Sequence, residues 1–311
     1  MTAPTLPEHV LVVGEALIDV VHRADGSVDE HPGGSPANVA LTLGRLGRDA
    51  RVLTWVGADA HGELVGRWLR SSGVRLVAGS EDAPATSLAT AHLDASGAAT
   101  YTFDLTWQVP AGARAEQGAL AVHTGSIAAV LEPGGTGVLE LVRAAREHAT
   151  VTYDPNARPQ IMGDPAQVRA RIEDFVAASD VVKVSDEDVE WLVPGHDPVD
   201  VARQWLALGP AVVVVTFGGE GAVAVTAAGE TRVAAPRIDV VDTVGAGDSF
   251  MGALLDGLWT AGLLGAERRE ELGSIDEPTL RTVLEQCVAV AAVTVSRAGA
   301  NPPTRAELTA G

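Results

Sequence analysis

Apolar and polar positions follow two rhythms along this chain, and the commoner one predicts alternating strands and helices. Six short apolar runs rich in β-branched residues predict buried strands, and the segments between them carry apolar residues at helical spacing. The expected strands are Val10–Gly14, Arg51–Val56, Ala119–Thr124, Thr150–Tyr153, Val181–Val184 and Ala211–Phe217. The expected helices are Ala37–Leu46, Gly62–Ser72, Gly137–Glu147, Ala166–Ala178, Asp186–Leu192 and Pro198–Leu208.

This alternation predicts an α/β fold with a mostly parallel central sheet that helices cover on both faces. Right-handed crossovers connect successive parallel strands in such folds. Ligands of an open α/β sheet bind in the crevice at the carboxyl ends of its strands. Length alone would allow two domains, but α/β folds of 311 residues are often one unit with a small appendage. We therefore treat residues 1–311 as a single domain.

Two regions depart from this rhythm and predict a small flap outside the main sheet. Residues 16–31 and 86–103 alternate apolar and polar positions at period two, with turn signals at Asp25-Gly26 and Ser96-Gly97. The two hairpins would lie together over one end of the sheet. An exposed strand edge can pair with a second copy of the chain, which makes a homodimer a candidate assembly.

Composition narrows the class of protein. With 46% hydrophobic and 20% charged residues, the chain lies in the globular range. No stretch of about 18 apolar residues lacks a charge or a glycine, which argues against a membrane span. The formal charge of -19 argues against nucleic acid and anionic membranes as partners, because most of the protein would repel them. The N-terminus has no basic segment ahead of an apolar core, so we expect a cytoplasmic protein.

The single cysteine is assigned to structure, and the single lysine is assigned no role. Cys287 excludes an internal disulfide, and its place in the apolar helical run Val283–Val295 predicts a buried thiol. Lys183 is the only lysine among 22 lysines and arginines, which we attribute to coding composition, and we assign it no role. A phosphate-rich ligand must then be met by backbone N–H groups, a few arginines and a divalent cation. The polar stretch Leu264–Glu277 is expected to be a surface loop.

The most informative stretch runs from Asp242 to Phe250 and combines glycines, a helix start and carboxylates. Gly245 and Gly247 allow consecutive N–H groups to turn toward one anion, and the apolar spacing from Phe250 predicts a helix that begins at or just after Gly247. The positive end of that helix would face a phosphate. Asp248 is either a simple helix cap or a base that deprotonates a hydroxyl beside the phosphate. A second carboxylate, Asp242, with no Lys or Arg between the two, favours the base.

A second glycine turn, from Gly33 to Asn38, also opens a helix. Its plainest interpretation is an ordinary strand-to-helix turn with Pro36 near the first helical position. Asn38 adds a functional alternative, because an amide both donates to and accepts from a sugar hydroxyl. Asp19, which follows the first strand, is either a solvated strand residue or a carboxylate that binds vicinal hydroxyls.

Polar residues follow three more of the expected strands, at the edge where the crevice is predicted. The run from Asp154 to Arg158 suits a turn, and its arginine is a planar cation that can clamp a phosphate or a substrate oxygen. The run from Ser185 to Asp188 is explained by helix capping, although its acids can also hold Mg²⁺ through water. The run from Thr216 to Gly221 is either a hairpin turn or a close approach to a ligand. The eight histidines show no paired ligand spacing, so no transition-metal site is assigned.

In this order, these segments resemble the ribokinase-like (PfkB) carbohydrate kinases. The stretch from Asp242 to Leu254 is similar to the C-terminal signature of that family, and Gly33 to Gly47 is similar to its N-terminal signature. The likeness extends from about Val10 to Leu308. It implies a three-layer α/β/α fold with a β-rich lid, which agrees with the alternation and the two hairpins described above.

The resemblance also implies roles for individual residues. Asp248 would be the catalytic base for the sugar hydroxyl, and Gly245, Ala246 and Gly247 would form the anion hole for the transferring γ-phosphate of ATP. The implied sugar-binding positions are Asp19, Gly34 and Asn38, with Asn156 and Arg158 toward the phosphate. The implied nucleotide positions are Thr216, Gly218 and Gly221, together with Ser185 and Asn301. The implied ion positions are Asp188 and Glu187 for a Mg²⁺–water network, and Asp242 and the carbonyl of Val244 for a monovalent cation such as K⁺.

Several segments look most like the fructokinases within this family, among them Gly14-Glu15, Tyr101 to Trp107 and Asp154 to Arg158. Two residues depart from the family pattern, since many relatives have Asn in place of Ser185 and Glu in place of Asp188. We therefore expect an ATP-dependent sugar kinase that converts fructose to fructose 6-phosphate. The alternatives are a 2-keto-3-deoxygluconate kinase, a ribokinase or nucleoside kinase of the same fold, and a sugar- or nucleotide-sensing protein on a kinase scaffold.

Overall fold

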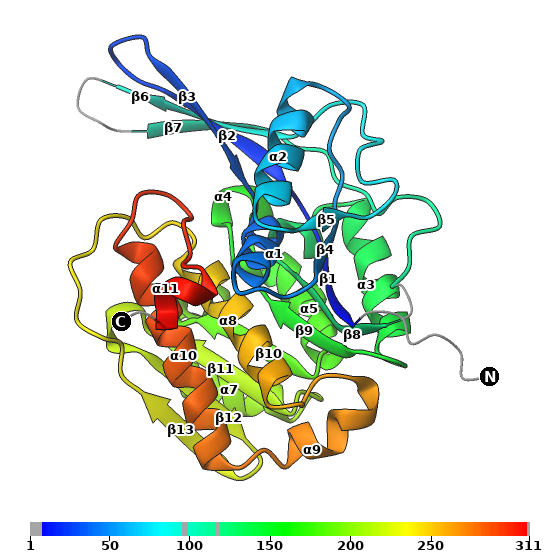
Figure 1. The fold of residues 1–311 in the computed structure, drawn as a ribbon, viewed down its shortest axis with the longest axis vertical. Coiled ribbons are helices and arrows are strands. Elements are labelled where there is room, and N and C mark those ends of the chain that lie inside the picture. Colours follow the sequence, from blue (N-terminus) through cyan, green and yellow to red (C-terminus); the bar gives the residue numbers. More distant parts are fainter. Residues whose placement is uncertain (1–7, 95–98, 116–117, 310–311) are drawn as a thin grey trace.

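The central element of the fold is a twisted, mostly parallel sheet. The computed structural model describes residues 8–94, 99–115 and 118–309, and in these ranges the sheet has nine strands in the order β13-β12-β11-β10-β9-β8-β1-β4-β5 (Figure 1). All neighbouring strands from β11 to β5 in this order pair in parallel. The pairs β11–β12 and β12–β13 are antiparallel. The strands are β1 (His9–Val13), β4 (Ala50–Leu53), β5 (Arg75–Leu76), β8 (Ala119–Gly125), β9 (Thr150–Asp154), β10 (Val181–Ser185), β11 (Val212–Thr216), β12 (Ala222–Thr226) and β13 (Gly229–Val233).

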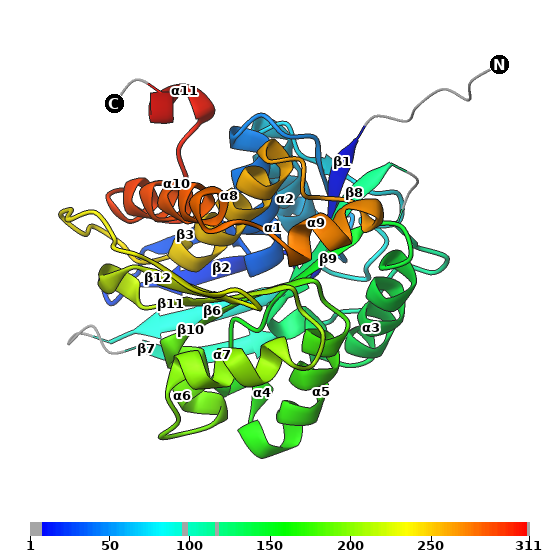
Figure 2. The same ribbon diagram turned by 90° about the horizontal axis from the view of Figure 1, so that it is seen from below.

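Helices cover both faces of this sheet and complete three layers, as predicted. Figure 2 shows α1, α8 and α10 on one face and α3, α5 and α7 on the other. One apolar core packs under each layer, around Leu254 on the first side and around Phe175 on the second, and both side chains are fully buried. The helices are α1 (Ser35–Arg45), α2 (Ala60–Ser71), α3 (Gly134–Ala145), α4 (Pro159–Met162), α5 (Pro165–Ala177), α6 (Asp186–Leu192), α7 (Pro198–Leu206), α8 (Ala246–Thr260), α9 (Arg269–Gly273), α10 (Glu277–Val295) and α11 (Arg305–Thr309), with 3₁₀ turns η1 (Ser126–Ala129), η2 (Gly218–Glu220) and η3 (Ala266–Arg268).

The six expected strands and the six expected helices are confirmed, with their ends shifted by a few residues. The strands are buried on both faces, which is why they read as continuous apolar runs. The short edge strand β5 was not predicted, because a strand of two residues is too short to show a pattern of apolar and polar positions.

The predicted flap is a separate sheet with the order β3-β2-β6-β7, seen at the top of Figure 1. Its strands are β2 (Leu17–His22), β3 (Val28–Gly33), β6 (Leu88–Leu93) and β7 (Ala99–Asp104). Each hairpin is antiparallel, and parallel pairing of β2 with β6 joins the two hairpins. The turn expected at Ser96-Gly97 lies outside the described residues. The boundary between this lid and the α/β unit stays a prediction.

The stretch Leu264–Glu277 is not the surface loop that its polarity predicts. It contains η3 and α9, and the side chains of Leu264, Leu272 and Ile275 are at most 6% exposed. The backbone N–H of Gly265 also donates to the Thr150 hydroxyl at 2.9 Å. Three anchoring apolar residues therefore fix a segment whose other side chains are mostly polar.

Two further expectations can be compared with the structure. Cys287 in α10 is fully buried, as predicted for a structural thiol. Among the described residues, no helix is both long enough and apolar enough to cross a bilayer.

Candidate active site

The amino-terminal end of α8 lies at the carboxyl edge of the sheet and has the geometry of an anion site. The helix begins at Ala246, one residue earlier than predicted, with Gly245 as its N-cap in the left-handed conformation (φ 76°). A Cβ on Gly245 would lie 2.7 Å from the Cβ of Ala300, so both the conformation and the close packing require glycine. No side chain caps the helix, which leaves N–H groups of its first turn available to a ligand.

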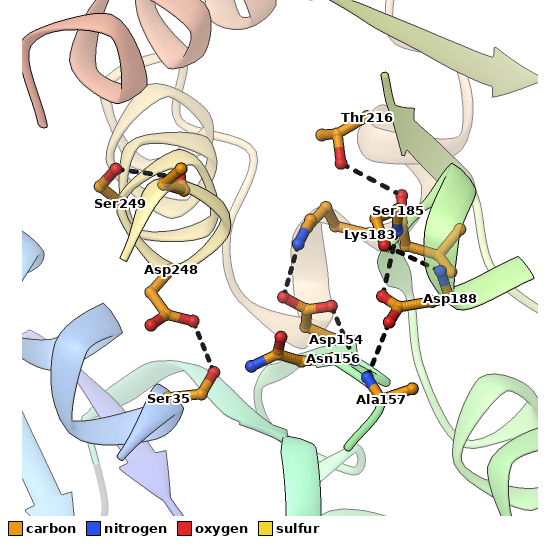
Figure 3. A network of polar contacts seen from close by, with 12 residues as sticks. Ser35, Asp154, Asn156, Ala157, Lys183, Ser185, Asp188, Thr216, Asp248 and Ser249 are labelled. Atoms are coloured by element: carbon orange, nitrogen blue, oxygen red, sulfur yellow. Dashed lines mark hydrogen bonds and ion pairs between the residues drawn. The ribbon is translucent and has the colours of Figure 1, made fainter. Parts of the chain in front are cut away.

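Asp248 lies in this first turn and faces the start of another helix. Its Oδ1 accepts a hydrogen bond from the Ser35 hydroxyl at 2.6 Å (Figure 3). Its Oδ2 accepts one from the Asn38 amide at 2.8 Å. The side chain is buried, and both donors are neutral. Because Asp248 bonds to α1 and not to its own backbone, the geometry disfavours a simple helix cap. A carboxylate has about four acceptor sites, so it can still accept the proton of a substrate hydroxyl.

A buried ion pair lies across the site from Asp248. The Lys183 ammonium donates to Asp154 Oδ2 at 2.8 Å, and the two side chains are 3% and 1% exposed (Figure 3). Burial raises the pKa of Asp154 to about 6, although Lys183 opposes that rise. Burial opposes the charge on Lys183, but the carboxylates of Asp154 and Asp188 raise its pKa overall. Neither residue was predicted from the sequence to have a role.

The register of two neighbouring strands explains why Lys183 and Asp154 lie side by side. Strands β9 and β10 are parallel neighbours in which Val182 pairs with Tyr153, so the next residue on each strand is Lys183 and Asp154. Each of these strands was predicted, but single-strand patterns do not say which strands are neighbours. The presence of one lone charge of opposite sign in each of two apolar strands would have been the clue.

Asp188 ties two of the predicted segments together. Its Oδ1 accepts from the N–H of Ala157 at 2.8 Å and its Oδ2 from the N–H of Ser185 at 3.2 Å, while the Ser185 hydroxyl accepts from the N–H of Asp188. This capping box is the structural alternative raised from the sequence. Glu187, next to it, is exposed.

The loop after β9 presents an unusual asparagine. Asn156 has a positive φ of 39°, and its Nδ2 is buried without a hydrogen-bond partner in the described structure. Arg158 is exposed and its guanidinium donates to the carbonyls of Asn156 and Ala157, so it folds back on its own loop. A buried amide donor without a partner is costly and points to a ligand or water at that position.

On the predicted nucleotide side, the run from Thr216 to Gly221 forms a tight connection between antiparallel β11 and β12. The Thr216 hydroxyl donates to the carbonyl of Val184 at 3.5 Å, and Gly218 is exposed in open space. A Cβ on Gly221 would lie 2.1 Å from the carbonyl oxygen of Val233, so close backbone packing alone explains this glycine. The interpretation of this run as a hairpin turn is therefore confirmed, and its role in nucleotide binding stays a prediction.

The C-terminal tail packs against the loop that precedes α8. Asp242 accepts from the N–H groups of Val244 at 3.0 Å and Gly299 at 2.8 Å, and these bonds lower its pKa. Val244 is 54% exposed. The side-chain oxygen of Asn301 accepts from Arg45, so this part of the side chain is engaged by α1.

Two more carboxylates lie near the predicted sugar site. A Cβ on Gly33 would lie 2.3 Å from Asp19 Oδ2, which places that carboxylate against the glycine turn. A Cβ on Gly34 would lie 2.5 Å from the carbonyl oxygen of Glu15. The Glu15 side chain is buried, accepts from the N–H of Ala128 at 3.1 Å, and has its pKa raised to about 7 by burial. From the sequence, Glu15 was noted only in the Gly14-Glu15 segment that resembles fructokinases.

These groups fit ATP and Mg²⁺. The uncapped helix and the buried Asn156 amide offer N–H donors that suit phosphate oxygens. In the part of the chain that the structure describes, no three His, Cys, Asp or Glu side chains gather as a metal cluster. Magnesium usually keeps several waters and binds one or two carboxylates plus substrate phosphates, and Asp188 with exposed Glu187 can serve it in that way.

Comparison with known sequences finds carbohydrate kinases along nearly the whole chain. Residues 7–307 match the family described as pfkB family carbohydrate kinase. A fructokinase from Rhizobium leguminosarum bv. trifolii is 34% identical over 287 residues, which cover 88% of this chain and 85% of the relative. A fructokinase from Escherichia coli is 33% identical over 318 residues, which cover 96% and 97%.

Solved structures show the same fold. A fructokinase with bound ATP from Xylella fastidiosa superposes with a TM-score of 0.81 at 23% identity and covers 98% of each chain. A fructokinase double mutant from Vibrio cholerae O395, in a form with bound fructose, ADP and potassium ion, superposes with a TM-score of 0.79 at 23% identity and covers 99% of each chain.

Proposed function

Because the chain belongs to the pfkB family of carbohydrate kinases, we propose that it transfers the γ-phosphate of ATP to the primary hydroxyl of fructose and makes fructose 6-phosphate. The observation that carries this proposal is Asp248, a buried carboxylate with two neutral donors that lies in the uncapped first turn of α8. This arrangement brings a proton acceptor and an anion site together. Transfer of a phosphoryl group to a hydroxyl needs both.

Asp248 accepts the proton of the sugar hydroxyl as the oxygen attacks phosphorus. The backbone of Gly245, Ala246 and Gly247 receives the charge of the transferring group through N–H groups and the positive end of the helix. A general base of this kind contributes about 10²–10⁴-fold in rate. Magnesium, when it is bound, neutralises charge on the phosphates.

The sugar lies between the lid and the start of α1 in this proposal. Asp19 and the backbone at Gly34 bind its hydroxyls, and the Oδ1 of Asn38, which is buried without a partner in the described structure, accepts from one of them. Asn156 and Arg158 bind oxygens toward the phosphate. The amide of Asn156 gains the partner that it lacks.

The nucleotide and ions occupy the other side of α8. We propose that Thr216, Gly218 and Gly221 line the nucleotide, with Ser185 and Asn301 nearby. Asp188 and Glu187 hold Mg²⁺ through water, and Asp242 with the carbonyl of Val244 holds a monovalent cation. The potassium ion bound to the Vibrio cholerae fructokinase form supports K⁺ as that cation.

Fructose is preferred over the alternatives for two reasons. The curated relatives at 33–34% identity are named fructokinases and cover most of this chain. A nucleoside kinase commonly stacks its base on aromatic side chains, and only 4% of these residues are aromatic. We also propose a cytoplasmic location, because the reaction consumes ATP, and pairing of two copies through the lid edge remains a prediction.

The test is ADP release over a panel of fructose, other hexoses, pentoses, 2-keto-3-deoxygluconate and nucleosides, with and without K⁺. We expect the highest kcat/KM with fructose and higher activity with K⁺. Preference for the keto acid or for a nucleoside would replace fructose with that substrate. Binding of sugar and ATP without ADP release from any substrate would make the protein a sensor and contradict the proposal.

A further inference from the structure

Lys183 is a buried cation that the mechanism above does not use. Its ammonium is within hydrogen-bond distance of one acceptor in the described structure, Asp154 Oδ2 at 2.8 Å. An ammonium has three N–H donors, so two of them are left for another acceptor. The side chain is 3% exposed, which makes bulk water a poor source of both acceptors. Such a group is expensive to keep in a core unless a ligand completes its bonds.

The ammonium lies directly against the predicted anion hole. A Cβ built on Gly247 would lie 2.9 Å from Lys183 Nζ, and that atom is the nearest one to the added carbon. Gly247 is the second residue of α8, one residue before Asp248. Figure 3 shows Lys183 and Asp154 on the side of the site opposite to Asp248 and Ser35. A group bound at the end of α8 would therefore have the base on one side and the ammonium on the other.

We propose that Lys183 is a catalytic residue that donates a hydrogen bond to the phosphoryl group during its transfer, with Asp154 as the positioning residue that aims the ammonium. This inference rests on the proposed kinase function. The bond from phosphorus to the β–γ bridging oxygen of ATP breaks, the bond to the sugar oxygen forms, and the hydroxyl proton passes to Asp248. Lys183 keeps its proton throughout and neutralises charge on the equatorial oxygens.

The acidity of the whole chain supports a role for the Lys183 cation in phosphate binding. The chain carries a formal charge of -19, so the site needs local cations to hold a polyphosphate. The nearby Arg158 is exposed and bonded to its own loop, whereas Lys183 is fixed within the site. A fixed cation in a site that excludes water stabilises developing charge without reorganisation, and loss of one such donor typically lowers kcat by about 10²–10³-fold.

The competing interpretation is that Lys183 only neutralises Asp154. Lys183→Met alone does not separate the two, because it leaves a buried carboxylate without its cation. The double variant Lys183→Met/Asp154→Asn removes both charges and restores the balance. If the pair is structural, the double variant regains wild-type turnover. If Lys183 contacts the phosphoryl group, turnover stays low although the protein is folded and binds ATP.

The experiment measures kcat, KM for sugar and ATP, the Kd for ATP and thermal unfolding. Wild type must first release ADP with a sugar, and its failure would overturn the proposed function instead of the role of Lys183. We expect the double variant to have a kcat about 10²–10³-fold below wild type with the Kd for ATP changed by less than about tenfold. A kcat within about threefold of wild type would overturn the inference. Arg269→Met is the control, since it removes one of the two arginines that bond to buried Asp180 elsewhere in the fold and should leave kcat unchanged.

A second measurement needs no variant. Because Lys183 is the only lysine of the chain, ¹⁵N-lysine labelling gives one side-chain ammonium signal. We expect that signal to shift when ADP, aluminium fluoride and sugar are added together, and to shift much less with sugar alone. An ammonium signal that is unchanged in the complete mixture, under conditions where ADP binding is saturated, would overturn the contact even if the double variant did not fold.

Discussion

Helix α8 carries two buried aspartates that have opposite surroundings. Asp248 in its first turn receives hydrogen bonds from a serine hydroxyl and an asparagine amide. Asp256, 0% exposed two turns later, is bonded by Arg48 at 2.6 Å, by Arg305 and by the Gln286 amide. The same helix therefore holds one carboxylate that is hydrogen-bonded by neutral donors and one that is bonded by two arginines and an amide.

The difference separates chemistry from structure. The two arginines at Asp256 come from the segment after α1 and from α11, and the glutamine comes from α10. This carboxylate therefore ties three distant segments to α8. Asp248 makes fewer and weaker bonds at the end of the helix where a phosphate would bind. A carboxylate that must accept a proton needs free lone pairs, while a structural carboxylate gains from filling them.

The largest effect should come from exchanging each aspartate for asparagine. Asp248→Asn should lower kcat by about 10²–10⁴-fold with little change in stability, because the amide cannot take the hydroxyl proton. Asp256→Asn should lower the free energy of unfolding by about 2–4 kcal/mol, since it leaves two partly buried arginines without a counter-ion, and kcat should be unchanged. Steady-state kinetics and urea unfolding measure both. Near-normal turnover by the Asp248 variant would remove the contrast.

Glu15 extends the comparison to a buried carboxylate whose hydrogen bonds in the described structure come from neutral donors. Burial raises its pKa from 4.5 to about 7, opposed by hydrogen bonds from its own backbone, Ser126 and Ala128 and by the charge of Arg158. Below pH 4.5 both states hold the proton, so the group has no effect. Between 4.5 and about 7 the unfolded chain loses its proton while the folded protein keeps it, and the free energy of unfolding falls by about 1.4 kcal/mol per pH unit. Above that range the full cost remains.

Glu15→Gln should remove this pH dependence. Relative to wild type, the variant should gain about 2–3 kcal/mol of stability between pH 5 and pH 8, measured by urea unfolding at both values. The matched control is Glu307→Gln at an exposed position, where the pKa is instead lowered to about 2 by bonds from Thr304 and Arg297, so no such gain is expected. Parallel stability curves for Glu15→Gln and wild type would show that Glu15 does not carry the raised pKa.

Two glycines of α8 provide a smaller test of the same contrast. A Cβ on Gly247 would meet the end of the Lys183 side chain at 2.9 Å, whereas a Cβ on Gly257 would meet Val283 Cγ1 of α10 at 2.8 Å. Gly247→Ala should displace the ammonium and lower kcat by about tenfold with little change in stability, because alanine favours the helix by about 1 kcal/mol. Gly257→Ala should cost about 1–3 kcal/mol through overpacking and leave kcat unchanged. A loss of stability in Gly247→Ala together with a loss of kcat in Gly257→Ala would contradict the assignment of chemistry to the first turn of α8 and of packing to its later turns.

The sequence predicted the fold better than it predicted this contrast. Strands β8 to β11 are short, almost fully buried segments, and their apolar runs, which alternate with segments of helical spacing, identify them. Asp248 was found because glycines, a helix start and an acid lie within one short stretch. Lys183 and Glu15 were missed as site residues because each is a single charge, one within an apolar strand and one just after another, and its role depends on which strand lies beside it. Sequence periodicity does not carry that information.

The smallest effects should come from removing one neutral donor at each aspartate. Ser35→Ala deletes the hydroxyl that donates to Asp248 at 2.6 Å, and Gln286→Ala deletes the amide that donates to Asp256. Each bond is worth about 1 kcal/mol in stability, so the two unfolding curves should be displaced by similar amounts. Their kinetics should differ, because Ser35 orients the carboxylate that accepts the proton: Ser35→Ala should lower kcat about three- to tenfold, and Gln286→Ala should leave it unchanged. Equal kcat values for the two variants would mean that the neutral bonds at Asp248 hold the helices together and do not position the base.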